Sequence, residues 1–135
     1  MYILVSDGGS RGNPGPSACS FGLYNDTSQT WEFKHTLYIG ETTNNVAEYH
    51  GLLYGLISIW SSGISSIKII SDSKLMVNQV NGSYQCNNEQ LKSLLHQVKT
   101  ILSKYNYEIS HVPRTHELIK VMDADYNICM ATLIK

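Results

Sequence analysis

The sequence predicts one α/β domain, residues 1–135, in which helices flank a mixed β-sheet. Two short apolar runs rich in β-branched residues, Tyr2–Ser6 and Ile67–Ser71, are typical of buried strands. Between them, from Asn44 to Trp60, apolar residues recur every three to four positions, as in an amphipathic helix. A second such segment covers Glu89–Tyr105. Strands followed by helices in this order indicate an α/β fold.

The first part of the chain is expected to form three antiparallel strands. After the first strand, the segment 8–16 holds four glycines and two prolines, which predicts a loop. Segments 18–25 and 30–38 are the next two strands, and the polar run Asn25–Ser28 supplies the turn between them. Such short connections are typical of hairpins and meanders.

The helix expected over 44–60 has a recognisable start and one narrow face. Thr43 or Asn44 is suited to cap its N-terminus. One line on its surface carries only small residues, namely Ala47, Gly51 and Gly55. Small side chains on one line allow a helix backbone to lie close to a sheet, so we expect this face to pack there.

The second part of the chain is expected to add two strands that run parallel to the first. These strands lie at 67–71 and 107–112, with helices over 73–80, 89–105 and 123–134. Each connection contains a helix, as a parallel crossover requires.

Composition excludes several classes of protein. Hydrophobic residues make up 42% of the chain, and the net charge is −1, so the chain is not disordered. No apolar stretch approaches the ~18–20 residues that span a membrane, and we expect no signal peptide. Three widely spaced cysteines favour a reduced, cytoplasmic setting. The near-neutral charge does not by itself indicate a nucleic-acid-binding protein.

Several acidic residues fall where an α/β sheet places its functional sites. Asp7 and Asp72 each follow a predicted strand, and Glu48 lies in the expected first turn of a helix. Asp123 and Asp125 are candidates for a fourth carboxylate. Such a cluster is stable only with a cation, and oxygen ligands select Mg²⁺ or Mn²⁺. The alternatives are simpler, because Asp is a common turn residue and Glu complements a helix dipole.

The glycine-rich segment 7–16 does not match a nucleotide-binding loop. It lacks the Gly-Lys-Ser/Thr of a P-loop, and no helix follows it as in a dinucleotide fold. It is either a plain turn or a place where a ligand comes close to the backbone.

Four segments, in order, resemble the motifs of type 1 ribonuclease H, especially its archaeal and bacterial subgroup. They are Asp7–Pro16 (DGGSRGNPGP), Thr42–Tyr49 (TTNNVAEY), Ser71–Ser73 (SDS) and His111–Arg114 (HVPR), the last followed by Ala124-Asp125. The resemblance extends over nearly the whole chain. It implies a ribonuclease H-like fold, with a five-stranded mixed sheet in the order 3-2-1-4-5 flanked by helices.

The resemblance also implies an activity and a cofactor. Members of this family cut the RNA strand of RNA–DNA hybrids with two Mg²⁺ ions, leaving 5′-phosphate and 3′-hydroxyl ends; Mn²⁺ is a substitute. By position, Asp7 would contact both ions, while Glu48 and Asp72 would hold the ion at the leaving oxygen. Asp125 would help to hold the ion that activates water. Asp125 is preferred to Asp123 because Ala124 precedes it, as in the family, and because Asp123 suits a helix N-cap.

Further residues match the family's substrate-binding positions. Asn13 and Asn44 would read the RNA strand, and Ser10 with the nearby backbone at Gly8 would contact 2′-hydroxyls. Thr43 and Asn45 would start a pocket for a DNA phosphate.

Lys74 replaces a common Gln, and Arg114 and His116 would assist product release or proton movement. The expected partner is an RNA–DNA hybrid bound by a monomer, with no membrane and no obligate protein partner.

The resemblance has one main gap, which leaves other functions open. The interval from Arg114 to Asp125 is longer than in typical relatives, and the Asn expected a few residues after the Arg is missing. If the last Asp cannot reach the metals, the chain is a silent nucleic-acid-binding module. Another alternative is the ribonuclease H part of a larger polymerase, or a resolvase-like nuclease of the same fold.

Overall fold

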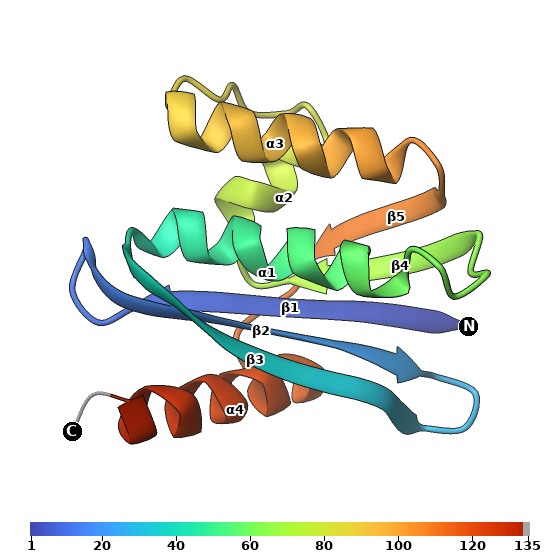
Figure 1. Ribbon diagram of the computed structural model, residues 1–135. Coiled ribbons are helices and arrows are strands. Elements are labelled where there is room, and N and C mark those ends of the chain that lie inside the picture. The colour runs from blue at the N-terminus through green and yellow to red at the C-terminus, as the bar shows by residue number, and fades with distance from the viewer. Residues whose placement is uncertain (134–135) are drawn as a thin grey trace.

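The computed structural model describes residues 1–133 and contains one mixed sheet of five strands in the order β3-β2-β1-β4-β5 (Figure 1). The strands are β1 Tyr2–Ser10, β2 Gly15–Asn25, β3 Thr30–Thr42, β4 Ser66–Ser71 and β5 Asn106–His111. The first three strands pair antiparallel, and β4 pairs in parallel with both β1 and β5. The predicted fold class and strand order are therefore confirmed.

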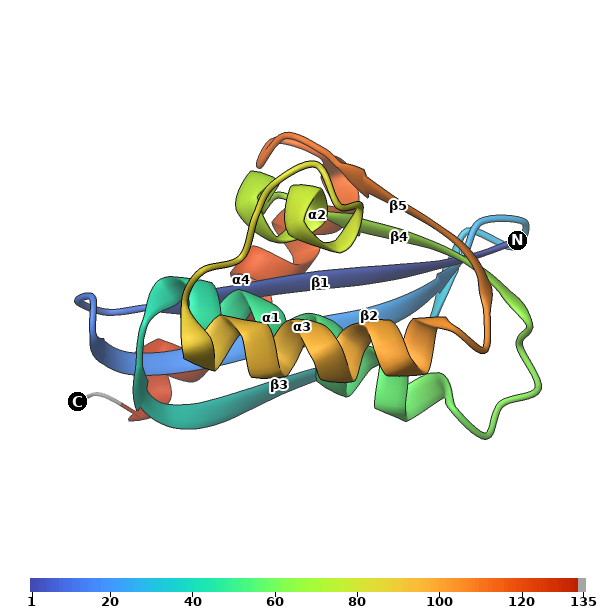
Figure 2. The same ribbon diagram turned by 90° about the horizontal axis from the view of Figure 1, so that it is seen from above.

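Helices cover both faces of this sheet. They are α1 Asn44–Ile59, α2 Lys74–Val80, α3 Glu89–Leu102 and α4 Glu117–Leu133. The first three lie on one face, and α4 lies alone on the other (Figures 1 and 2). Within residues 1–133, no helix is long and apolar enough to cross a membrane.

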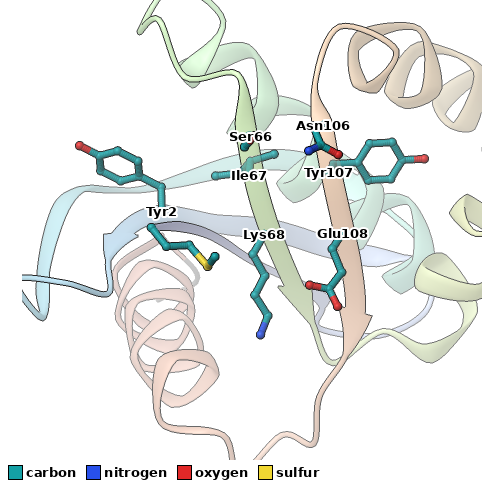
Figure 3. Close-up of a pocket in the computed structure, with 8 residues that line it drawn as sticks. Tyr2, Ser66, Ile67, Lys68, Asn106, Tyr107 and Glu108 are labelled. Carbon is teal, nitrogen blue, oxygen red and sulfur yellow. The ribbon is translucent and has the colours of Figure 1, made fainter.

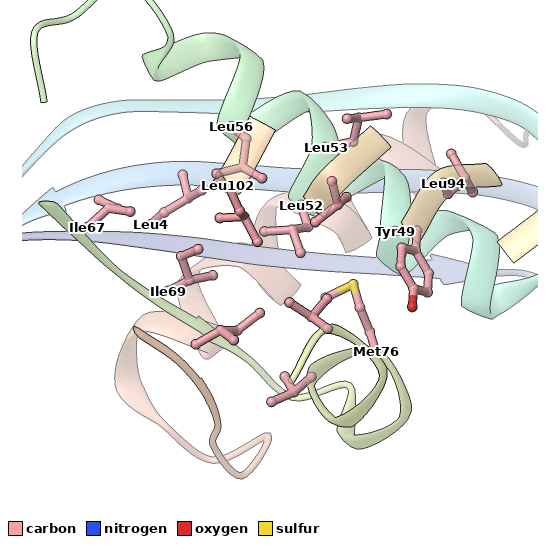
Figure 4. Close-up of a cluster of buried hydrophobic side chains, with 14 of the residues drawn as sticks. Leu4, Tyr49, Leu52, Leu53, Leu56, Ile67, Ile69, Met76, Leu94 and Leu102 are labelled. Atoms are coloured by element: carbon pink, nitrogen blue, oxygen red, sulfur yellow. The ribbon is translucent and has the colours of Figure 1, made fainter. Parts of the chain in front are cut away.

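The larger hydrophobic core lies between the sheet and helices α1 to α3 (Figure 4). Leu4 of β1, Leu52 and Leu56 of α1, and Leu102 of α3 are almost completely buried there. Each such side chain contributes about 1.5–3 kcal/mol by its burial. A smaller cluster under α4 includes Val5 of β1, so alternate residues of β1 face opposite helical layers.

The strand β1 is longer than the sequence predicts. Gly8, Gly9 and Ser10 continue the antiparallel ladder with β2, opposite Cys19, Ala18 and Ser17. The expected loop over 8–16 is therefore wrong for most of its length, and the turn is confined to residues 11–14. Glycine disfavours strands locally, but pairing with a neighbouring strand overrides that preference here.

The terminal helix also begins earlier than the sequence predicts, at Glu117 instead of Asp123. His116 precedes it, and the Nδ1 of His116 accepts a hydrogen bond from the Leu118 backbone N–H at 3.2 Å. Asp123 therefore lies inside α4, and its assignment as an N-cap is wrong. The predicted end of this helix, Ile134, lies outside the described residues.

Candidate metal centre

Three acidic side chains meet at the carboxyl end of β1 and β4. Asp7, Glu48 and Asp72 each place one carboxylate oxygen within 4.8 Å of the others. The parallel pairing of β1 with β4 ends at Val5 and Ile70, and each Asp lies two residues beyond it. The sheet therefore brings both Asp side chains to one edge, as their positions after predicted strands suggested.

Glu48 reaches this edge because α1 lies very close to β1. A Cβ atom on Gly8 would lie 2.4 Å from the carbonyl carbon of Ala47, so only glycine fits there. A Cβ atom on Gly51 would lie 2.8 Å from the Asp7 carbonyl oxygen, which confirms that the line of small residues faces the sheet. At Gly8, the group that comes close to the glycine backbone is therefore the backbone of α1, and not a ligand.

The start of α1 sets where Glu48 stands on the helix. The Oγ1 of Thr43 accepts a hydrogen bond from the Val46 backbone N–H at 3.3 Å, so Thr43 is the N-cap. Glu48 is the fifth residue of α1, and the expectation that it lies in the first turn is wrong. Its carboxylate is only 6% exposed, so it does not serve as a solvent-facing partner of the helix dipole.

Burial and mutual repulsion both raise the pKa values of two of these carboxyl groups, Asp7 and Glu48. Burial, and then the charge of Asp72, raise the pKa of Asp7 to about 8, against a hydrogen bond from the Gly8 N–H. Burial, followed by the charges of Asp7 and Asp72, raises the pKa of Glu48 well above its usual value. The protein alone therefore disfavours a fully ionised cluster at neutral pH.

Two oxygens of the cluster lack any partner among the described residues. They are Glu48 Oε1 and Asp72 Oδ1, and both are buried. Arg114 offers partial compensation, with its Nε 3.5 Å from Asp72 Oδ2, but its side chain is 84% exposed. Buried carboxylate oxygens without partners are costly, and a hard divalent cation would satisfy them. The donor set, which contains only oxygen, fits Mg²⁺ or Mn²⁺.

A cavity opens beside the cluster, between the β1–β2 turn, α1 and α4. It is lined by Asp7, Gly8, Gly9, Ser10, Arg11, Asn44, Arg114, Asp123, Tyr126 and Asn127. Five residues expected to form the site therefore lie together here: Asp7, Gly8, Ser10, Asn44 and Arg114. Asp123, the alternative candidate for the fourth carboxylate, also lines it, whereas Gly9, Arg11, Tyr126 and Asn127 were not assigned to the site.

Asp123, and not Asp125, is the α4 carboxylate that lines the cavity. Asp123 lines the same cavity as Asp7, and its charge adds to the raised pKa of Asp7. Residues two apart on a helix point about 200° apart, so both cannot face the cluster. The apolar spacing of Ile119, Met122 and Tyr126 was the signal that could have predicted this orientation.

The remaining predicted residues have structural contacts or stand apart from the cavity. Asn13 Oδ1 accepts a hydrogen bond from the Asn44 N–H at 2.9 Å and so joins the β1–β2 turn to α1. Asn45 is exposed on α1, and Lys74 is exposed at the start of α2. Neither Lys74 nor His116 lines the cavity. The Nδ1 of His116 is engaged in capping α4.

A second pocket lies at the opposite end of the same strands (Figure 3). Its lining includes Tyr2, Lys68, Tyr107 and Glu108, and Lys68 pairs in register with Glu108. Among the described residues, the group Asp7, Glu48 and Asp72 is the one cluster that could hold a metal ion. The second pocket therefore has no comparable chemistry.

Comparisons with known proteins agree with this geometry. The family model described as "Reverse transcriptase-like" matches residues 6–119. A bifunctional protein of Mycobacterium tuberculosis is 36% identical over 115 residues, which cover 83% of this chain and 31% of that protein. Ribonuclease HI of Halobacterium salinarum is 36% identical over 110 residues, which cover 80% of this chain and 54% of that protein. The chain thus spans about a third to a half of these relatives.

Solved structures match the whole fold. The N-terminal ribonuclease H domain of the M. tuberculosis protein has a TM-score of 0.88 at 32% identity, covering 94% of this chain and 96% of that one. The RNase H1 of H. salinarum has a TM-score of 0.89 at 30% identity, covering 97% and 98%. LC11-RNase H1, in complex with an RNA/DNA hybrid, has a TM-score of 0.91 at 28% identity and full coverage of both chains.

Proposed function

Because the chain belongs to the reverse transcriptase-like family of ribonuclease H-like domains, we propose that it is an endonuclease that cleaves the RNA strand of RNA–DNA hybrids. The observation that carries the proposal is the buried cluster of Asp7, Glu48 and Asp72, two of whose oxygens lack a partner. Similarity to ribonuclease HI of H. salinarum, and to an RNase H1 solved with an RNA/DNA hybrid, supports this substrate.

The cluster would hold Mg²⁺, with Mn²⁺ as a substitute. Two such ions would supply an activated water molecule and would stabilise the departing 3′ oxygen, which gives 5′-phosphate and 3′-hydroxyl ends. Asp7 belongs to the cluster and also lines the cavity, whereas Glu48 and Asp72 do not line it, so we assign Asp7 contact with both ions. Glu48 and Asp72 complete one site. For the other site we propose Asp123 in place of Asp125, because Asp123 lines the cavity with Asp7.

Arg114 would balance the charge of the cluster. Its guanidinium lies next to Asp72 and lowers the pKa values of Asp7 and Glu48, in opposition to burial. Its exposure leaves donors free to meet a substrate phosphate. We therefore assign it to binding near the reacting phosphate, and we assign His116 to the capping of α4.

The β1–β2 turn and the start of α1 would bind the substrate. Ser10 and Asn44 line the cavity, and Asn13 holds the turn against α1. Thr43 and Asn45, at the positive end of the α1 dipole, would meet a phosphate of the DNA strand. Lys74 would add an ionic contact. Contacts to 2′-hydroxyls on one strand would distinguish a hybrid from duplex DNA.

We further propose that the protein acts as a monomer. The three cysteines are unpaired, which suits the reducing cytoplasm in which we propose that it works.

The test is a cleavage assay on four labelled substrates of one sequence: an RNA–DNA hybrid, single-stranded RNA, duplex RNA and duplex DNA. We expect the RNA strand of the hybrid to be cut internally and the others to remain intact. Equal cutting of single-stranded RNA would contradict the proposed specificity. Tight binding of the hybrid without cleavage would instead support the alternative, a silent nucleic-acid-binding module.

A further inference from the structure

We propose that Arg11, in the turn between β1 and β2, is a positioning residue that holds Asp123 toward Asp7 through Asn127. The proposal rests on the function proposed above, and in particular on the role of Asp123. None of the four sequence motifs assigns a role to Arg11 or Asn127.

A continuous set of hydrogen bonds links the turn to the carboxylate. Arg11 Nη2 donates to Asn127 Oδ1 at 3.0 Å, and Asn127 Nδ2 donates to Asp123 Oδ2 at 3.4 Å. Asn127 is four residues after Asp123, so the two side chains lie on the same side of α4. Asn127 is also the one described side chain that hydrogen bonds to Asp123.

A second contact of Arg11 is made with Tyr126, the residue before Asn127 on α4. The Arg11 guanidinium lies over the Tyr126 ring, 5.6 Å from its centroid. The Tyr126 ring in turn packs on Gly9, where an added Cβ atom would lie 2.9 Å from the ring. Gly9 is two residues after Asp7 on β1, so these contacts fix α4 beside the carboxylate cluster.

Arg11 is itself held by the turn. Its backbone N–H donates to the Pro16 carbonyl at 2.8 Å, and Ser10 Oγ donates to the Thr42 carbonyl at 3.1 Å. The turn therefore has a fixed position relative to β1, β2 and the end of β3. Buried apolar side chains hold α4 to the sheet, and the contacts of Arg11 and Asn127 act on the polar side of the helix, where Asp123 lies.

Loss of Arg11 should therefore weaken cation binding and the chemical step, and should leave substrate affinity unchanged. Partners that orient a metal-ligating carboxylate are typically worth about 10–100-fold in metal affinity or activity. We expect the lower end, about tenfold, because Arg11 and Asn127 are exposed and water replaces their contacts in part.

The experiment compares Arg11→Gln, Arg11→Lys, Asn127→Ala and Asp123→Asn, with Lys34→Gln as the control. Lys34 lies over the Trp31 ring at 5.9 Å, a similar cation–aromatic contact far from the cavity lining. The readouts are Mn²⁺ binding by calorimetry without substrate, and kcat and KM on a hybrid. We expect Arg11→Gln and Asn127→Ala to lower Mn²⁺ affinity and kcat about tenfold at constant KM, Arg11→Lys to recover most of the loss, and Lys34→Gln to match wild type.

Combining variants separates positioning from direct contact. In the Asp123→Asn background, Arg11→Gln should cause no further loss, because the carboxylate that it positions is gone. A raised KM with unchanged Mn²⁺ affinity, additive with Asp123→Asn, would overturn the inference and make Arg11 a phosphate contact. Wild-type Mn²⁺ affinity and kcat in Arg11→Gln would also overturn it. If the wild type cleaves no hybrid, the proposed function fails, while the Mn²⁺ measurements still decide the role of Arg11.

Discussion

The two ends of the parallel strands β1, β4 and β5 carry different sets of charged side chains. At the carboxyl end, Asp7, Glu48 and Asp72 place like charges within 4.8 Å of one another, largely buried. At the amino end, Lys68 and Glu108 face each other on neighbouring strands, with opposite charges and access to water (Figure 3).

Uncompensated charge distinguishes the edge of the sheet that forms the site. At the amino end, residues of opposite charge stand in register, so like charges do not gather there. At the carboxyl end, repulsion and burial leave a deficit of positive charge that the protein does not supply itself. The close approach of α1 to Gly8 creates this deficit, because it delivers Glu48 into the space beside Asp7.

The largest expected effect on the cleavage rate comes from replacing Asp7, the carboxylate assigned to both ions. Asp7→Asn should lower single-turnover cleavage of a hybrid at least about a thousandfold, which is about 4 kcal/mol of barrier. The reason is that Asp7 is assigned contact with both ions. Asp26→Asn, in the exposed turn between β2 and β3, is the matched control and should cleave normally. Retention of more than a tenth of the wild-type rate by Asp7→Asn would contradict the assignment.

The next effect tests the close approach of α1. Gly8→Ala places a Cβ atom 2.4 Å from the Ala47 backbone, so α1 must shift and carry Glu48 with it. A shift of about 1 Å at a reacting centre can cost about a hundredfold in rate, which we expect here.

Gly63→Ala is the control for this substitution. Gly63 has a φ of +83° and open space around it, so the change should cost about 1–2 kcal/mol of stability without affecting the rate. Equal rates for Gly8→Ala and wild type, both measured well below their melting temperatures, would show that the approach of α1 does not matter to the site.

Replacing the α4 carboxylates should lower the cleavage rate less, and only at one of the two positions. Asp123→Asn should lower the cleavage rate at least about thirtyfold, near 2 kcal/mol, because Asp123 lines the cavity with Asp7. Asp125→Asn, two residues away on the same helix, is the matched control and should change the rate less than about threefold. The reverse order would restore the assignment that the resemblance implied.

The charge deficit should also appear in stability, without any substrate. The pKa of Asp7 is raised to about 8, so between about pH 4 and 8 the folded protein keeps a proton that the unfolded chain releases. Metal-free protein should therefore lose stability as pH rises through this window, and Mg²⁺ should restore it.

Asp7→Asn should flatten this dependence. At pH 8 in EDTA we expect it to be more stable than wild type by more than about 1.4 kcal/mol, the value of one pKa unit. Urea unfolding followed by circular dichroism at several pH values measures both quantities. A wild-type protein whose stability rises with pH over this window would contradict the electrostatic account.

The smallest effect is expected at the amino end of the strands. Lys68→Gln and Glu108→Gln should each leave the cleavage rate within about twofold of wild type and should change stability by less than about 1 kcal/mol, as is usual for exposed charge pairs. A large loss of activity in either variant would show that this pocket takes part in substrate binding and would remove the contrast between the two ends.

Much of the fold was predictable because it follows from local patterns. The apolar runs at Tyr2–Ser6 and Ile67–Ser71 and the helical period of α1 are strong signals, and the structure has a strand or helix at each. Residue type and place before the helical period narrowed the cap to Thr43 or Asn44, and the structure has Thr43 there. The line of Ala47, Gly51 and Gly55 correctly indicated the face of α1 that meets the sheet.

The errors share one cause, which is that contacts distant in sequence decide the outcome. Gly8 and Gly9 have little tendency to form a strand, but β2 supplies their hydrogen-bond partners. The early start of α4 goes with the packing of Ile119 and Met122 against Val5 and Ile70, which are distant in sequence. The apolar spacing within α4 indicated which face of the helix is buried, but not these partners. Arg11 and Asn127 meet across 116 residues of sequence and carried no signal beforehand.

The central claim is that the buried carboxylates need a bound cation to cleave a hybrid. The most direct measurement strips the protein with EDTA and follows cleavage of the RNA strand as Mg²⁺ is added back. We expect no cleavage in EDTA, a rate that rises with Mg²⁺ to a plateau in the wild type, and no such rise in Asp7→Asn. Undiminished cutting in EDTA, or the same Mg²⁺ response in Asp7→Asn, would contradict it.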